Sequence, residues 1–210
     1  IEYRGNHRLV PAASDFTMVE YEIARSLEML STGKAPYLPL QMLILGNPEH
    51  RYEQLQTLLQ YAGFTLVPPV RPEDGLEISI PLIVIGSEYA EPSIARSIDR
   101  FLGQGGSAAF FVSGTVVAAS TDWNARTKEN DPVLAMLKKR GVDIAGSFIR
   151  DREHYTIVMP PVDGSEVPST IPYPPWPRVK PKRIPNWHPV FSGISTLQFF
   201  WPSPIYTDET

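Results

Sequence analysis

The chain has 210 residues, a formal net charge of −4 and no cysteine, and 42% of its residues are hydrophobic. This composition predicts a globular protein with a real core, and it excludes wholesale disorder, disulfide bonds, cysteine-based metal sites and a cysteine nucleophile. The acidic balance argues against nucleic acid as a partner, and no apolar run approaches the roughly 18–20 residues of a membrane-spanning helix. Because the chain begins with Ile1 rather than Met, we expect it to be part of a longer protein.

The N-terminal part of the chain predicts a hairpin followed by an amphipathic helix. The pair Gly5-Asn6 favours a tight hairpin turn. Residues 17–30 predict a helix, because Thr17 fits the first position of a capping box and apolar residues recur at steps of three or four. Gly33 is placed to end this helix in left-handed backbone. The apolar positions that predict the buried stripe are Phe16, Val19, Ile23, Leu27 and Leu30.

Strands and helices alternate through the middle of the chain. The predicted strands, which are short and apolar, are 40–45, 64–67, 82–85, 108–112 and 142–149. The predicted helices, each with a residue suited to a first turn or a cap, are 48–61, 92–102 and 131–140, the last capped by Asp131 or Asn130. Strands without polar alternation indicate helices on both faces of a sheet. The predicted fold class is therefore α/β, with a doubly wound, mostly parallel sheet.

Proline dominates the chain after Met159, with ten prolines in about 30 residues. Proline lacks an amide donor, so this composition argues against a helix or an interior strand. Because Trp176 and Trp187 are large aromatic residues that are rarely left in solvent, we expect an extended strap that packs on the domain. The predicted organisation is an α/β sandwich with its N-terminal hairpin and helix at 1–159, followed at 160–210 by the strap and a final strand near 196–201.

Two loops at predicted strand ends carry the candidate ligand- or partner-binding residues. Asn47, Glu49 and His50 follow one strand, and Ser87 and Glu88 follow another. Ligands of open α/β sheets collect at the carboxyl ends of the strands, so we expect the two loops to lie side by side and form a crevice. The chemical alternatives for these residues are acid–base catalysis, metal binding and a serine nucleophile. The structural alternative is that they only form the loops. Neighbouring helical residues diverge and G-x-S-x-G is absent, which favours solvated helix-start residues and loop structure over catalysis.

Other motifs predict structure rather than chemistry. The glycine-rich segment at 103–106 follows a helix, whereas phosphate-binding loops follow a strand and open a helix, so it predicts a helix end. The four histidines are scattered, and no metal or other cofactor is expected. The basic run at 178–183 predicts a solvated face, with lipid phosphates or an acidic partner as the alternative.

The order of short motifs along the chain resembles the GldG family of gliding-motility and ABC-transporter auxiliary proteins, in their extracytoplasmic domain. The resemblance covers essentially the whole chain, although the loop at 45–50 differs from the Gly-His-Gly-Glu form common in the family. The motifs that carry it are EYEI at 20–23, LGNPEH at 45–50, IGS at 85–87, IDRFL at 98–102, NDPVL at 130–134, KRGV at 139–142, YPPWP at 173–177, HPV at 188–190 and WPSP at 201–204.

This resemblance implies a membrane-anchored accessory component of a bacterial ABC transport system, with this domain facing the periplasm and the membrane segments outside this chain. The implied partners are the permease and ATPase subunits of the same system, with a small ligand as a further candidate. The implied fold is of the flavodoxin or glutamine-amidotransferase type. The absence of cysteine excludes the amidotransferase reaction, and the absence of a P-loop agrees with a separate ATPase.

Three hypotheses about function remain. The leading one is a non-enzymatic binding or interaction domain of an ABC-transporter auxiliary protein. The alternative is a hydrolase or carbohydrate-active enzyme that uses Glu49, His50, Ser87 or Glu88. The third is a purely structural scaffold.

Overall fold

A computed structural model describes residues 1–7, 19–33, 38–47, 52–67, 75–117, 125–159, 168–180 and 196–207. The chain divides into two compact units, which are described separately. One comprises Ile1–Gln41 with Arg51–Pro68, and the other Met42–His50 with Pro69–Thr210. The domain boundary expected between residues 159 and 160 stays a prediction.

The first unit contains two helices and short strands. Its elements are β1 (Glu2–Tyr3), β2 (Asn6–His7), α1 (Val19–Thr32), the start of β3 (Leu38–Ile44), α2 (Glu53–Tyr61) and β4 (Phe64–Val67). Strands β1 and β2 form the expected antiparallel hairpin, but its left-handed turn residues are Arg4 and Gly5 rather than Gly5 and Asn6. Strands β3 and β4 pair in parallel.

Helix α1 forms where the periodicity predicts it and ends at the expected glycine. Gly33 has a φ of 69°, and its amide donates to the carbonyl of Met29. The buried face differs from the predicted stripe, because Ile23 and Leu27 are exposed while Ser26 is fully buried. Periodicity shows that a helix has an apolar face, but the neighbouring elements decide which face is covered. The predicted cap, Thr17, lies outside the described residues.

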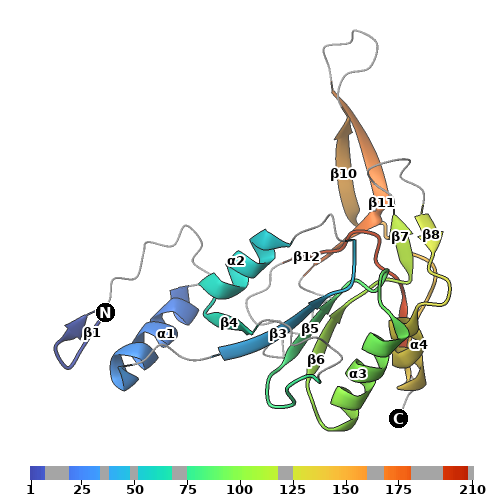
Figure 1. Cartoon of the computed structure of the whole chain (residues 1–210). Helices are drawn as coiled ribbons and strands as arrows, with labels where there is room; N and C mark the ends of the chain where they lie inside the picture. Colours follow the sequence, from blue (N-terminus) through green and yellow to red (C-terminus); the bar gives the residue numbers. More distant parts are fainter. Residues whose placement is uncertain are drawn as a thin grey trace. The chain divides into compact units, whose positions relative to one another are not determined.

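The second unit is built around parallel strands and two helices. Its central elements are β5 (Leu82–Ile85), α3 (Pro92–Gly103), β6 (Ala108–Phe111) and α4 (Pro132–Lys139). The strand order of the four-stranded sheet is β4-β3-β5-β6, with parallel pairing of β3 with β4 and of β5 with β6. Helices α3 and α4 lie beside β5 and β6 (Figure 1). The expectation of an α/β fold with a parallel sheet is confirmed at this level.

The core of this unit joins the parallel strands to both helices. Val84, Ile98 and Val133 are completely buried, and they come from β5, α3 and α4 respectively. Strand β6 differs from the expected fully buried strand, because burial alternates along it and Phe111 is exposed. Alternate residues of a strand point to opposite faces of the sheet, so one face of β6 is less covered than the faces of β5.

Short antiparallel sheets complete the second unit. Their strands are β7 (Thr115–Val117) with β8 (Ala125–Thr127), β9 (Val142–Ile144) with β13 (Ile205–Thr207), and β10 (His154–Met159), β11 (Ser169–Val179) and β12 (Leu197–Gln198) in that order. The final strand expected near 196–201 corresponds to β12. The sequence did not predict β13.

The proline-rich segment was expected to form neither a helix nor an interior strand. The second part of this expectation is wrong, because β11 is an interior strand between β10 and β12. Its prolines act as hydrogen-bond acceptors. The carbonyls of Pro174, Pro175 and Pro177 accept from the amides of Asp151, Trp201 and Phe199 respectively. Proline loses its amide donor but keeps its carbonyl, so an interior strand tolerates it wherever only the acceptor is needed.

Aromatic packing holds this segment against the following chain. The ring of Trp176 makes edge-to-face contacts with Tyr173 at 5.4 Å and with Trp201 at 5.5 Å between ring centroids. Trp201 also donates a hydrogen bond from Nε1 to the hydroxyl of Tyr173. Such pairs add to the area buried by the rings. Trp187, the second tryptophan that predicted packing, lies outside the described residues.

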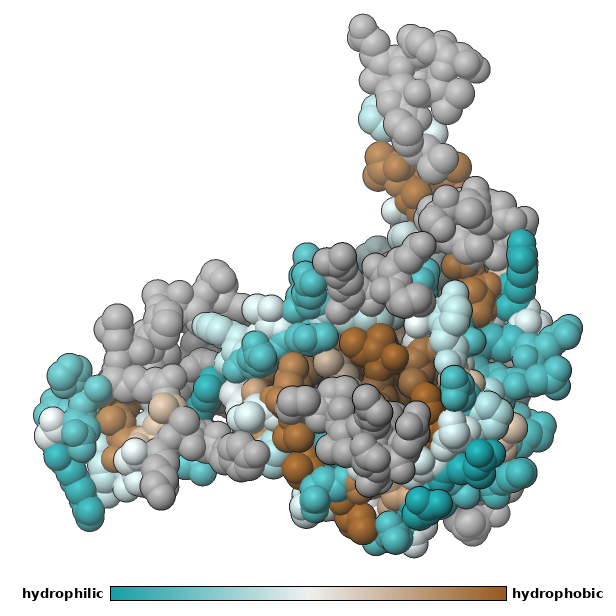
Figure 2. All heavy atoms as spheres, viewed as in Figure 1, coloured by the Kyte–Doolittle hydropathy of each residue, from teal (hydrophilic) through white to brown (hydrophobic). Residues whose placement is uncertain are grey.

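The β10–β11 hairpin projects from the parallel strands of its unit (Figure 1). It carries apolar side chains near its outer end, where Val158 is 64% exposed, and these form a brown patch in Figure 2. Among the helices of the described ranges, none combines the length and apolar character required to cross a bilayer.

Candidate functional site

The loops that follow β3 and β5 lie side by side, as expected for the carboxyl ends of neighbouring strands. The amides of Leu45 and Gly46 both donate to the carbonyl of Ile85, at 2.8 and 3.1 Å. A Cβ atom on Gly86, whose φ is +68°, would lie 2.4 Å from the Cα atom of Gly46. The two loops therefore touch backbone to backbone at these glycines, and no crevice separates them there.

The candidate residues predicted from the sequence are only partly placed. Asn47 is half-buried at the end of the first loop, and Glu49 and His50 lie outside the described residues. Ser87 and Glu88 form a network with two residues that the sequence did not assign to the site, Lys128 and Asp131. The binding role of the five predicted residues stays a prediction.

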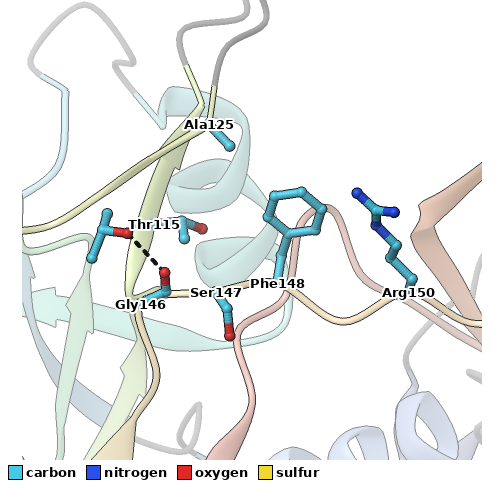
Figure 3. Close-up of a pocket in the computed structure, with 7 residues that line it drawn as sticks. Thr115, Ala125, Gly146, Ser147, Phe148 and Arg150 are labelled. Atoms are coloured by element: carbon cyan, nitrogen blue, oxygen red, sulfur yellow. Dashed lines mark hydrogen bonds between the residues drawn. The ribbon is translucent and has the colours of Figure 1, made fainter.

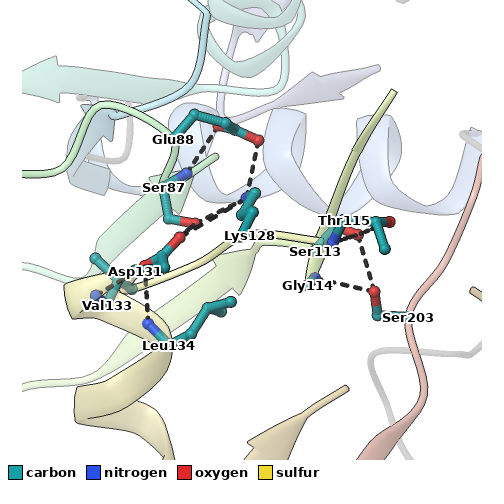
Figure 4. A network of polar contacts seen from close by, with 10 residues as sticks. All are labelled: Ser87, Glu88, Ser113, Gly114, Thr115, Lys128, Asp131, Val133, Leu134 and Ser203. Atoms are coloured by element: carbon teal, nitrogen blue, oxygen red, sulfur yellow. Dashed lines mark hydrogen bonds and ion pairs between the residues drawn. The ribbon is translucent and has the colours of Figure 1, made fainter. Parts of the chain in front are cut away.

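Ser87 lies at the centre of this network (Figure 4). Its side chain is buried, with the residue only 1% exposed. The Ser87 hydroxyl donates to Asp131 Oδ2 at 2.6 Å and accepts from Lys128 Nζ at 2.9 Å. The hydroxyl proton is thus directed at Asp131, and a lone pair is occupied by Lys128.

Lys128 is a buried cation between two carboxylates. Its Nζ atom lies 2.8 Å from Glu88 Oε1 and 3.9 Å from Asp131 Oδ2, and its side chain is only 5% exposed. A buried charge is tolerated when it is paired and hydrogen-bonded. The three contacts of the ammonium group meet that condition.

Asp131 joins the network to the start of α4. Its Oδ1 atom accepts from the amides of Val133 at 2.9 Å and Leu134 at 3.0 Å, so the predicted helix cap is confirmed. Its other oxygen takes the Ser87 hydroxyl. One carboxylate therefore caps a helix and fixes the loop after β5.

Glu88 is held in its ionised form. Burial raises the pKa of its carboxyl, but the hydrogen bond and charge of Lys128, together with the amides of Glu88 and Ser87, outweigh burial and hold that pKa below its usual 4.5. The amide of Ser87 donates to Glu88 Oε2 at 3.0 Å. The acid of the loop thus serves as an anionic anchor for Lys128 at neutral pH.

A second polar cluster lies at the end of β6 and also appears in Figure 4. Ser203 Oγ accepts from the amide of Gly114 at 2.9 Å, and it lies 3.0 Å from Ser113 Oγ. Ser113 Oγ is in turn 3.2 Å from Thr115 Oγ1. This cluster ties the WPSP segment to the sheet and gives that short motif a structural explanation.

Two kinds of chemistry are relevant to this network: a serine–lysine nucleophile pair and a metal site. A serine hydroxyl within hydrogen-bond distance of a lysine amine is the arrangement of a serine–lysine nucleophile pair. Here, however, Lys128 donates to Ser87 instead of accepting its proton, and Asp131 is occupied as a cap. In the part of the chain that the structure describes, no group of three or more His, Asp or Glu residues is placed to hold a metal ion.

Sequence reasoning missed Lys128 because no local motif marks it. It lies 41 positions from Ser87, and only the fold brings the two together. Asp131 was found, but as a helix cap alone.

Comparison with known proteins gives one match. A family model described as an ABC-type uncharacterized transport system matches residues 26–210. No significant match was found among curated proteins or among solved structures.

Proposed function

Because the chain belongs to this family of ABC-transport auxiliary proteins, we propose that it is a non-enzymatic, extracytoplasmic binding or interaction domain. The family indicates an auxiliary component of an ABC-type transport system. The resemblance to GldG proteins supports the finer assignments: the periplasmic orientation, the membrane anchor outside this chain, and the permease and ATPase as partners. The strand order β4-β3-β5-β6 supports the flavodoxin-like arrangement expected of that domain.

The observation that supports a non-enzymatic role is that the polar groups beside the strand ends are hydrogen-bonded to one another. The Ser87 hydroxyl both donates and accepts a hydrogen bond within the protein, and the residue is 1% exposed. A nucleophile needs access to its substrate and a base that can take its proton. Ser87 lacks that access, and the carboxylate that accepts its proton, Asp131, also caps α4. In this proposal the network therefore holds the loop and the helix in place.

The partner assignment is tested by purification. The full-length protein, tagged and extracted from its native membranes in mild detergent, is expected to co-purify with an ABC permease and ATPase. A tagged unrelated protein of the same membrane is the control. Recovery of the protein from the soluble cytoplasmic fraction, without either subunit, would overturn the proposal.

Orientation is tested by labelling, since this chain has no cysteine. The variant Glu129→Cys places one thiol at an exposed position of the described chain. If no other accessible thiol is present in the full-length protein, a membrane-impermeant maleimide is expected to label the variant in intact spheroplasts. Labelling that requires lysis would place the domain on the cytoplasmic side.

One observation favours the second candidate, a hydrolase or carbohydrate-active enzyme. It is the 2.9 Å contact between Ser87 Oγ and Lys128 Nζ. A fluorophosphonate probe tests it, with Ser113→Ala as the control for another serine at a strand end. We expect no labelling that depends on Ser87. Labelling that Ser87→Ala abolishes and Ser113→Ala leaves intact would establish a nucleophile and refute the non-enzymatic role.

A further inference from the structure

A pocket of about 320 Å³ lies beside the β7–β8 hairpin, apart from the Ser87 network (Figure 3). This volume is at the lower end of the range for small-molecule sites. Its lining residues come from the hairpin and from the segment after β9, and include Ala125, Thr127, Gly146, Ser147, Phe148 and Arg150.

The segment that forms one wall of this pocket is fixed at both ends. The amides of Ala145 and Ile149 donate to the carbonyls of Pro204 at 3.0 Å and Pro202 at 2.8 Å. Between them, Gly146 accepts a hydrogen bond from Thr127 Oγ1, and a Cβ atom on Gly146 would lie 2.3 Å from Thr127 Cγ2. The wall is therefore held in place before any ligand arrives, which lowers the entropic cost of binding.

Arg150 supplies a cation without a carboxylate partner among the described residues. Its guanidinium carbon lies 5.7 Å from the centroid of the Phe148 ring, and Figure 3 shows the two side chains next to each other. A guanidinium over a ring uses its flat face, and its N–H donors in the plane stay available for an anion.

Ser147 lies three residues before this cation, and its side chain points away from Arg150 in Figure 3. Within the described chain, neither the hydroxyl nor the backbone amide of Ser147 makes a hydrogen bond. Phe148 and Ala125 add apolar surface to the same pocket. Ligand sites combine an apolar lining with a few such polar groups that fix orientation.

We propose that this pocket binds a small organic anion. The anionic group pairs with Arg150, and the apolar part of the ligand packs against Phe148 and Ala125. Carboxylates and phosphate monoesters share this chemistry, because a guanidinium binds either through paired N–H donors. This inference goes beyond the proposed function, since it concerns a different surface and needs no transport partner.

Calorimetric titration of the whole chain tests the proposal with three probes: benzoate, phenyl phosphate and the uncharged benzyl alcohol. We expect saturable binding of at least one anion and none of the alcohol. Arg150→Gln is expected to weaken binding about tenfold or more, because it removes a charge-assisted contact. Arg152→Gln is the matched control, since Arg152 is an exposed arginine two residues away that does not line the pocket.

The relative affinities of benzoate and phenyl phosphate identify the anion class. Amide shifts of Gly146 and Ser147 in NMR spectra locate the site, and unchanged thermal melting of Arg150→Gln shows that the variant is folded. If Arg150→Gln melts early, Phe148→Leu replaces it, and weaker binding of the anion is expected. Equal binding of anion and alcohol, equal loss in both arginine variants, or no saturable binding of any probe would overturn the proposal.

Discussion

The hydroxyl of Ser87 donates a 2.6 Å hydrogen bond to Asp131, a residue 44 positions further along the chain. The bond joins the loop after β5 to the first turn of α4. Lys128 completes the junction, because its ammonium group contacts both the Ser87 hydroxyl and the Glu88 carboxylate. The charged groups of Lys128, Glu88 and Asp131 therefore stabilise this part of the fold and also set the charge distribution of the candidate site.

Asp131→Ala is expected to lower the free energy of unfolding by about 2–4 kcal/mol. The variant removes the cap of α4 and leaves the buried Ser87 hydroxyl without its acceptor. Asp131→Asn keeps an oxygen for the cap and is expected to cost only about 1–2 kcal/mol. Urea denaturation measures both. Equal costs for the two variants would show that the cap contributes nothing.

Lys128→Met is expected to destabilise the protein by about 2–4 kcal/mol, because it leaves Glu88 and Asp131 near each other without their shared cation. Glu88→Gln is expected to cost less, since the Glu88 side chain is 25% exposed. A double-mutant cycle with both substitutions measures the coupling. A coupling energy near zero would mean that the ion pair is not formed in solution.

The protein is expected to become less stable in acid, because the Glu88 carboxylate is protonated there. Its folded-state pKa is held below 4.5 by Lys128 and two backbone amides, which outweigh the opposing effect of burial. A depressed pKa adds stability that is fully present above the unfolded-state value and is lost as the pH falls through the folded-state value. Denaturation curves recorded from about pH 7 downward measure this. The Glu88→Gln variant should show a shallower decline below pH 4.5 than the parent; identical slopes would contradict the assignment.

Gly86→Ala is expected to cost about 3 kcal/mol or more, because its φ of +68° is strained for alanine and the new Cβ atom would lie 2.4 Å from the backbone of Gly46. Gly105→Ala is the matched control. Gly105 also has a positive φ, of +91°, but nothing lies within 4 Å of the added atom. Its cost is expected to be about 1 kcal/mol. Comparable costs in the two variants would show that the loops can separate freely.

Local sequence signals predicted individual elements well where they are self-contained. The strands at 64–67 and 82–85 and the cap at Asp131 are found where the residues indicate them. The stripe of α1 and the interior position of β11 were predicted incorrectly. In both cases the error concerns what an element packs against, which neither periodicity nor proline content specifies.

The amino-acid sequence by itself determined the class of the protein, because short apolar strands without polar alternation, separated by helices and glycine turns, predict a parallel α/β core. Only the tertiary structure decided which polar groups meet, since Ser87 and Lys128 are brought into contact across 41 residues by the packing of α4 against β5 and α3. The physical reason is the range of the two kinds of interaction. Backbone conformation and capping act over a few residues, whereas ion pairing depends on distances that are set by the packing of the whole unit.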